Sequence, residues 1–311
     1  MNILKTSLTI LTVTAVLSAD SIDDKFQSLV GKSLFLSNTS TLSSGHYTFN
    51  KEGGDEPELS TGGLGFPYFF GEEGDLWRPF VLGGVGYSTI TEDNTNLRGV
   101  RGDDIEIKSL YYKVGGGLSY NPTCNFQFIL GGSALVMNSD GDYSSITPIG
   151  ASIRDKKIDK LLNSETTNKI YDGFGGFIYK PTIYGYQSEI KSTLHYLKMD
   201  FDQDVEDIDG VYLNMLAKIR SNELTTIWQE PVWIEYYVGG DFVNSKLADV
   251  VGFNSAVTLG STLHWRVGPL IPWIRDSRFK DLNIAINFQK TISNTDFEGW
   301  KGGVGFSLVK F

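Results

Sequence analysis

The chain has 311 residues, a formal net charge of −10, 41% hydrophobic residues and one Cys, and these values exclude several classes of protein. The hydrophobic content is too high for a disordered chain, and a single Cys cannot build a disulfide framework. The negative net charge argues against a dedicated nucleic-acid binder, which carries a basic face. The 35 Gly residues and the 13% of aromatic residues favour β-structure over a helical protein.

Residues 1–19 have the pattern of a secretory signal peptide. Lys5 provides a basic start, residues 8–17 form a mostly apolar stretch, and Ala19 is the small residue expected at a cleavage site. A stretch this short cannot cross about 30 Å of hydrocarbon as a helix. We therefore expect an exported mature chain that begins near residue 20, in which Cys124 has no second Cys to pair with.

Apolar and polar residues alternate along most of the remaining chain, which is the pattern of β-strands with two different faces. Leu64, Phe66 and Tyr68 form one such row, and Leu110, Tyr112 and Val114 form another. The pattern predicts about twelve strands, at residues 41–50, 58–70, 77–90, 104–120, 124–138, 169–185, 188–199, 210–221, 225–239, 255–267, 282–293 and 300–311.

The predicted connections alternate between short and long. Short ones lie at 71–76, 121–123, 186–187 and 221–224, and long ones at 91–103, 139–168 and 240–254. Short periplasmic turns and long external loops are typical of an outer-membrane barrel. We therefore predict an all-β fold, a transmembrane antiparallel up-and-down β-barrel with both ends of the chain on the periplasmic side.

A secreted soluble β-sandwich or β-barrel is the alternative, since it also alternates, with its apolar face turned inward. The long strands favour the membrane barrel. So do aromatic residues near strand ends, which are typical of girdles at the two membrane surfaces: Tyr68, Phe69, Phe70, Trp77, Tyr184, Tyr186, Trp228, Trp265 and Trp300.

The last ten residues, Gly302-Gly303-Val304-Gly305-Phe306-Ser307-Leu308-Val309-Lys310-Phe311, follow a strand pattern and end on an aromatic residue. With the signal peptide and about twelve strands, this ending resembles bacterial outer-membrane proteins. The chain is most similar to the translocator barrel of autotransporters, in a solitary form without a passenger. One departure is that the family has apolar residues at alternate positions counted back from the terminal Phe, whereas only Val309 fits and Ser307, Gly305 and Gly303 do not.

The resemblance implies a location in the outer membrane of a Gram-negative bacterium and a structural or translocator-like role. It implies two partners, outer-membrane lipid and the barrel-assembly machinery, which reads the C-terminal strand through Phe311 as assembly signal. No nucleic acid and no cofactor are expected. The domains would be a signal peptide at 1–19, a periplasmic or pore-inserted segment at 20–40 and the barrel at 41–311.

Charged and His side chains fall on the strand face opposite the apolar rows, so we expect them to line the lumen. Lys or Arg on the lipid face would cost about 2–4 kcal/mol at mid-membrane. Two interpretations remain open, a lumen braced by ion pairs such as Glu235 with Arg220, and a water-filled, basic-leaning pore that acts as a small-solute channel. The candidates are Lys113, Lys180, Lys191, His195, Lys218, Arg220, Glu235, His264 and Arg266, together with Asp172 and Glu189.

Three further segments have distinctive patterns. Residues 200–209 carry alternate carboxylates that resemble a calcium loop, but Val205 stands where an EF-hand has Gly, so a solvated acidic loop is the favoured interpretation. Helical spacing of apolar residues predicts short helices at 21–30 and at 154–162, the first before the barrel and the second in the longest loop.

The sequence does not indicate an enzyme, and a barrel hydrolase is the least favoured hypothesis. The chain has three His residues, and none has the spacing of a metal site. Ser44 and His46 stand close in sequence without the known phospholipase pattern, and His195 with Asp200 or Asp202 is the remaining candidate acid–base pair. We assign no catalytic, cofactor-binding or metal-binding residue.

Overall fold

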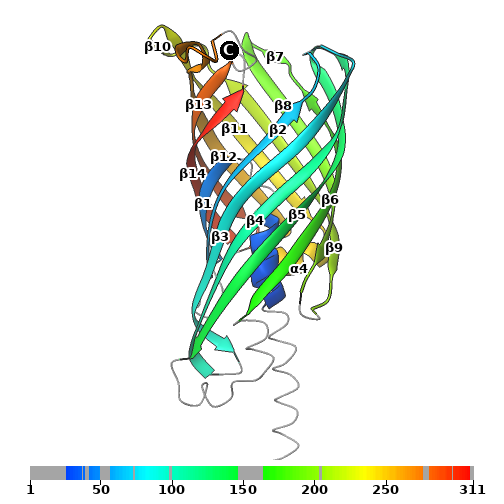
Figure 1. Ribbon diagram of the computed structural model, residues 1–311, viewed down its shortest axis with the longest axis vertical. Coiled ribbons are helices and arrows are strands. Elements are labelled where there is room, and N and C mark those ends of the chain that lie inside the picture. The colour runs from blue at the N-terminus through cyan, green and yellow to red at the C-terminus, as the bar shows by residue number, and fades with distance from the viewer. Residues whose placement is uncertain are drawn as a thin grey trace, which may run out of the picture.

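The computed structural model describes residues 26–36, 38, 42–49, 57–72, 74–97, 100–145, 164–202, 205–275, 280–295 and 297–308. These residues form a closed barrel of twelve antiparallel strands, with a short helix at residues 26–36 (Figure 1). The predicted fold class and strand number are confirmed. Among the described helices, none is both long and apolar enough to cross a membrane.

Each strand of the barrel pairs with the next one in sequence, and β1 pairs with β14 to close the sheet. Two short strands, β7 (Thr182–Ile183) and β10 (Thr225–Ile227), lie at hairpin turns, and the helix α4 (Ser245–Val251) follows β11. The twelve wall strands are β1 (Leu42–Phe49), β2 (Glu58–Phe69), β3 (Trp77–Leu97), β4 (Val100–Thr123), β5 (Phe126–Ser145), β6 (Glu165–Tyr179), β8 (Tyr186–Asp200), β9 (Ile208–Arg220), β11 (Glu230–Val243), β12 (Ser255–Arg266), β13 (Leu282–Ser293) and β14 (Phe297–Leu308).

The outer face of the barrel carries an apolar belt. On β4, Val114 is 67% exposed, and the outward-facing residues between Leu110 and Tyr120 are uncharged. The belt ends at the charged Lys108, which is the next outward-facing residue beyond Leu110. Ten residues at about 3.3 Å each, tilted by about 40°, span about 25 Å, which is the height of the lipid-facing band of outer-membrane barrels. The belt therefore has the dimensions of a bilayer-spanning surface, as in outer-membrane barrels.

The two ends of the barrel differ. At one end, the short-turn end, short links join β2 to β3, β4 to β5, β6 to β8 and β9 to β11, and β14 ends there (Figure 1). The link between β12 and β13 at this end is longer and contains the 3-10 helix η1 (Gly268–Leu270). At the opposite, long-loop end, β3 continues to Leu97 and β4 begins at Val100, so the loop predicted at 91–103 is wrong. Likewise β5 and β6 reach into the predicted loop at 139–168. The alternation is weak there because both faces of a strand that has left the bilayer tolerate polar residues.

Two hairpin turns at the short-turn end use backbone with positive φ. Trp228 and Gln229 have φ of 55° and 67° between β10 and β11, whereas in the turn after β7 only Tyr184 (φ 51°) is a non-glycine residue and Gly185 follows at φ 86°. A side chain in this left-handed region costs about 1–2 kcal/mol, a cost that Gly avoids. The turn at Trp228 and Gln229 is therefore strained.

We predict that Gln229→Gly raises the free energy of unfolding by about 0.5–1 kcal/mol, because relief of the strain exceeds the extra entropy of the unfolded glycine. Gly185→Ala, which introduces the same strain into the other turn, lowers it. Urea titration of the folded barrel in lipid vesicles measures both effects. A loss of stability in Gln229→Gly would contradict the assignment of strain.

We also predict that Val114→Arg destabilises the barrel by about 2–4 kcal/mol, since Val114 lies at the middle of the apolar belt. Asn138→Arg provides the matched control. Asn138 is exposed on the same outer face, at the long-loop edge of the belt opposite Leu110, where the cost falls to about 0–1 kcal/mol. Equal losses in vesicles would place the bilayer elsewhere on the barrel.

Candidate functional site

The helix at residues 26–36 fills the long-loop half of the lumen. Its apolar residues recur at three- and four-residue intervals, and each is at most 9% exposed: Phe26, Leu29, Val30, Leu34, Phe35 and Leu36. They join one apolar core with inward-facing side chains of the wall, among them Ile90, Ile105, Leu135, Met137, Ile170, Leu197 and Met199. This half of the lumen is therefore packed like the interior of a soluble protein.

Close contacts with α4 and its neighbours fix the helix. A Cβ atom at Gly31 would collide with the side chain of Val250, so only glycine allows the two helices to approach this closely. The ring of Phe35 lies edge-on to Tyr212, at 5.2 Å between centroids, and to Phe253 at 6.0 Å. The predicted helix at 21–30 extends further than expected, to residue 36, because tertiary packing uses Gly31 as a contact and not as a stop.

The C-terminal end of this segment is held by polar contacts. Lys113 Nζ donates to the carbonyl oxygen of Asn38 (2.8 Å), and Asn38 Nδ2 donates to Asp172 Oδ2 (3.2 Å). Asp172 also lies 3.0 Å from His195 Nδ1, and His195 Nε2 lies 3.1 Å from Thr193 Oγ1. At the other end, Gln27 donates to the backbone of Glu206 beyond β8. The helix therefore has its N-terminal end towards the long-loop end of the barrel.

The acidic partner predicted for His195 was wrong. Residues 193 and 195 point inward with Asp172. Asp200 stands at an even-numbered position of β8, on the other face of the strand, and pairs with Lys198 at 2.8 Å. Asp202 accepts a hydrogen bond from the backbone of Thr167. Asp172, His195 and Thr193 stand in the order acid, base and hydroxyl, but Thr193 is only 2% exposed. A substrate cannot reach its hydroxyl, so this chain of contacts stabilises the wall.

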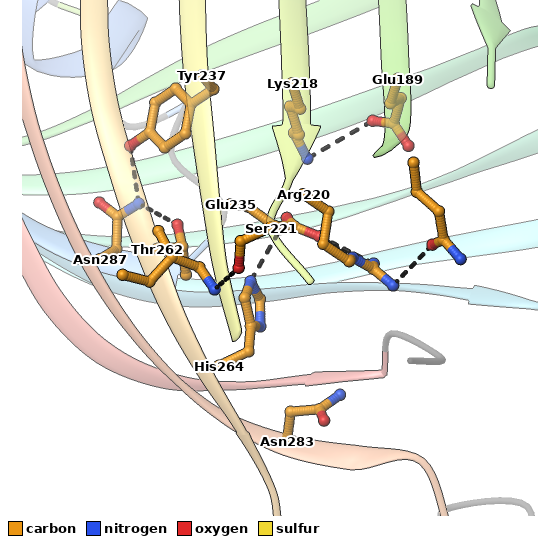
Figure 2. Close-up of polar contacts among 12 residues, drawn as sticks. Glu189, Lys218, Arg220, Ser221, Glu235, Tyr237, Thr262, His264, Asn283 and Asn287 are labelled. Carbon is orange, nitrogen blue, oxygen red and sulfur yellow. Dashed lines mark hydrogen bonds and ion pairs between the residues drawn. The ribbon is translucent and has the colours of Figure 1, made fainter. Parts of the chain in front are cut away.

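A network of charges and hydrogen bonds crosses the short-turn half of the lumen (Figure 2). The ion pair expected between Glu235 and Arg220 is present, with 2.9 Å between Oε1 and Nη2 of residues directly opposite each other on β11 and β9. His264 Nε2 lies 3.4 Å from the other oxygen of Glu235. The Arg220 guanidinium also lies over the ring of the fully buried Trp233, at 5.4 Å. One carboxylate thus organises two basic side chains.

A second group of contacts continues this network around the wall. Lys218 Nζ lies 3.5 Å from Glu189 Oε1 on the neighbouring strand. Asn287 Nδ2 donates to Tyr237 Oη (2.8 Å) and to Thr262 Oγ1 (2.9 Å), which links three strands (Figure 2). The amide and hydroxyl residues of this group were not singled out from the sequence, because uncharged polar residues on an inner face carry no signal of their own.

Between the helix and this network lies a cavity of about 440 Å³. The helix closes it on one side with Phe35 and Leu36. The wall contributes charged and polar residues, among them Lys191, Lys218, Glu235, Asp241, His264 and Lys301. The lumen is thus apolar and packed in one half and polar and hollow in the other.

The predicted lumen residues occupy different places. Lys191, Lys218, Glu235 and His264 line the cavity, Lys113 and His195 hold the helix segment, and Arg220 lies in the network. Arg266 pairs with Glu230, at 3.4 Å, near the short-turn end. Lys180 is exposed in the turn after β6, so it is not part of the wall. Lys301 also lines the cavity but was not among the predicted residues, although alternation along β14 places it on the inner face. Phe311 and the predicted helix at 154–162 lie outside the described residues.

The acidic segment at 200–209 has lysine partners in the residues that the structure describes. Lys198 lies 2.8 Å from Asp200 and 3.2 Å from Asp207, and Lys246 lies 3.5 Å from Asp209. In the described ranges, no cluster of three or more His, Cys, Asp or Glu residues is placed to hold a metal ion. Two lysines thus partner three of the carboxylates of this segment.

We predict that Glu235→Gln lowers the free energy of unfolding by about 3 kcal/mol, because the partly buried Arg220 loses its carboxylate. Glu298→Gln is the matched control, since the pair of Glu298 with Lys290 has side chains that are 45% and 33% exposed and contributes less than about 1 kcal/mol. Denaturant titrations in vesicles compare the two. Similar small losses would show that the network does not stabilise the barrel.

Comparisons with known proteins agree with this architecture. No family model and no curated protein matches the chain. The translocator domain of the autotransporter NalP from Neisseria meningitidis matches with a TM-score of 0.52 and 12% identity, over 95% of this chain and 98% of that one. The β-domain of the Bordetella autotransporter BrkA (TM-score 0.49, 10% identity, 85% and 95% covered) and the transport unit of AIDA-I from Escherichia coli (0.48, 11%, 86% and 88%) are also similar. The chain therefore has the fold of an autotransporter-type translocator barrel.

Proposed function

We propose that this protein is an autotransporter-type barrel with a structural or translocator-like role, and that its lumen is closed by the helical segment that precedes the first strand. The observation that carries the proposal is the helix at residues 26–36, which lies inside the barrel with its apolar side chains buried against the wall. Removing this helix would expose apolar surface on both partners, so the closed state is the stable one.

This arrangement supports a closed barrel over the alternative of an open small-solute channel. Water-filled pores need a continuous polar path, and the apolar core occupies the long-loop half of the lumen. The polar cavity occupies only the short-turn half of the lumen, so it does not form such a path. A hydrolase is supported less, because the acid–base pair of Asp172 and His195 faces a buried hydroxyl.

The proposal extends to the ends of the chain and to its partners. We propose that residues 1–19 are removed on export and that residues 20–40 form the pore-inserted segment. The outer face would contact membrane lipid, and the barrel-assembly machinery would read the C-terminal strand, with Phe311 as the signal. These steps require no cofactor and no nucleic acid.

Planar-bilayer recordings test whether the helix closes the lumen. We expect no steady conductance from the mature chain starting at residue 20, and a steady conductance after residues 20–38 are deleted. A second variant keeps the full length: Gly31→Trp forces the helix away from Val250 and should also open the barrel. Heat-modifiable gel mobility shows that each variant is folded.

A disulfide provides the matched control. Ser33 Oγ and Ser88 Oγ lie 2.5 Å apart, so Ser33→Cys with Ser88→Cys, in a Cys124→Ser background, should lock the helix to β3. The oxidised protein should remain closed under voltage. A steady current through the mature chain that is unchanged by the cross-link would overturn the proposal.

A further inference from the structure

A serine, a histidine and a glutamate meet on the outer face of the barrel, towards the long-loop ends of β1 and β2. His46 and Ser60 lie directly opposite each other on these strands, and Glu58 is the next residue on the same face of β2. His46 Nδ1 lies 3.2 Å from Ser60 Oγ, and His46 Nε2 lies 4.0 Å from Glu58 Oε2. Ser44 is closer to His46 in sequence, but the register of the two strands places Ser60 opposite the ring.

The two contacts give different roles to the two nitrogens of the His46 ring. A neutral imidazole has one N–H donor and one acceptor nitrogen. With the proton on Nε2, the donor faces the carboxylate of Glu58, and Nδ1 accepts the hydroxyl hydrogen of Ser60. The negative charge of Glu58 favours this tautomer and stabilises the imidazolium that forms when Nδ1 takes the proton. Hydroxyl, base and carboxylate thus stand in the order of a hydrolytic triad.

This group is accessible, unlike the inward-facing Thr193. The side chains of His46 and Glu58 are 53% and 55% exposed, and Ser60 is partly exposed. A substrate therefore reaches the hydroxyl and the ring without any movement of the wall. Thr89 lies directly opposite Ser60 on β3, and directly opposite residues have Cβ atoms about 5 Å apart. Its hydroxyl is thus within reach of an oxyanion that forms at Ser60.

The group lies at the long-loop edge of the apolar belt. On the outer face of β2, the residues change from the exposed and apolar Phe66 and Leu64 to Ser60 and the charged Glu58. On its other side, β1 pairs with β14, where Trp300 lies directly opposite His46. Trp is enriched where a membrane meets water. The ester groups of membrane lipids lie at this depth, between the acyl chains and the head groups.

The surface beside the group has room for an acyl chain. Gly302 follows Trp300 on the outer face of β14, towards the middle of the belt. A Cβ atom at Gly302 would have only the carbonyl oxygen of Asn287 within 4 Å, at 3.7 Å. The exposed ring of Phe288 belongs to the residue directly opposite Gly302 on β13. A bare, apolar position thus lies next to the hydroxyl and the ring, which suits a long-chain substrate.

We propose that Ser60, His46 and Glu58 form a hydrolytic site for the acyl esters of membrane lipids, an activity beyond the structural role of the barrel. Ser60 Oγ attacks the ester carbonyl carbon while His46 Nδ1 takes the hydroxyl proton. The bond to the lipid alcohol then breaks, and His46 gives its proton to that alcohol. Water attacks the acyl-serine, and His46 moves one proton from the water to Ser60 Oγ as the fatty acid leaves. Glu58 is a positioning residue, because it acts through His46.

A fluorophosphonate probe, which labels activated serines, tests the site in the refolded mature chain in micelles. We expect mass spectrometry to find the label on Ser60, and we expect turnover of 4-nitrophenyl palmitate. Ser60→Ala should abolish both. His46→Asn should lower kcat by at least about a hundredfold, as is typical for the loss of a general base.

The role of Glu58 has its own readout. Glu58→Gln should lower kcat by about tenfold and leave KM unchanged, a smaller loss than for a buried triad carboxylate because Glu58 is exposed. Glu298→Gln is the matched control. Glu298 and Glu58 lie opposite Thr48 from its two sides, but Glu298 contacts Lys290 at 3.3 Å. Its variant should keep full activity.

Two further variants separate the site from the rest of the outer face. Ser192→Ala removes a hydroxyl from β8, where Phe177 and Met215 lie opposite and no histidine does, so activity should be unchanged. Gly302→Phe should raise the KM for the palmitate ester and leave that for the acetate ester unchanged, because only the long chain needs the bare surface.

Lipid substrates complete the test. Vesicles of phosphatidylglycerol and micelles of an acylated disaccharide lipid separate the two classes of lipid that carry such esters, and release of fatty acid from either one supports the proposal. Release from neither would overturn it. So would turnover that survives in Ser60→Ala, or labelling of Ser60 at an unchanged rate in His46→Asn, with each variant shown by gel mobility to be folded. These outcomes do not depend on whether the barrel conducts, so they are independent of the proposed closed state.

Discussion

The structure depends on the filling of a lumen that inward-pointing side chains cannot fill alone. A barrel of eight strands is just narrow enough to be filled by its own side chains, and twelve strands enclose a wider space. Here the chain supplies the missing volume with the helix at residues 26–36, which converts half of the lumen into an apolar core. The cavity lies where this helix ends, with Phe35 and Leu36 on one side of it.

The two halves of the lumen are stabilised by different interactions. In the long-loop half, stability comes from apolar burial, with Phe26 and Leu29 almost fully enclosed. In the short-turn half, charged side chains point inward, and Glu235 pairs with both Arg220 and His264 there. Between them, Asn38 contacts Lys113 and Asp172 of the wall.

The inner and outer faces of the strands could be predicted because side chains alternate with a period of two. This alternation placed Lys191, Lys218 and His264 on the inner face. It also predicted the ion pair of Glu235 with Arg220, because the two residues lie on the inner faces of neighbouring strands. Parity could not place Lys180, because it follows the end of β6 in a turn. It also could not show that His195 contacts Asp172, since that contact depends on the register between β6 and β8.

The sequence by itself determined the class of the protein, because the lipid face requires apolar residues at every second position and such alternation is visible in a single chain. It also determined the approximate number of strands and the types of side chain in the lumen. Only the tertiary structure decided that the helix continues through Gly31, has its N-terminal end towards the long-loop end and packs into one half of the lumen. These features depend on shape complementarity with Val250 and the wall, which no local pattern encodes.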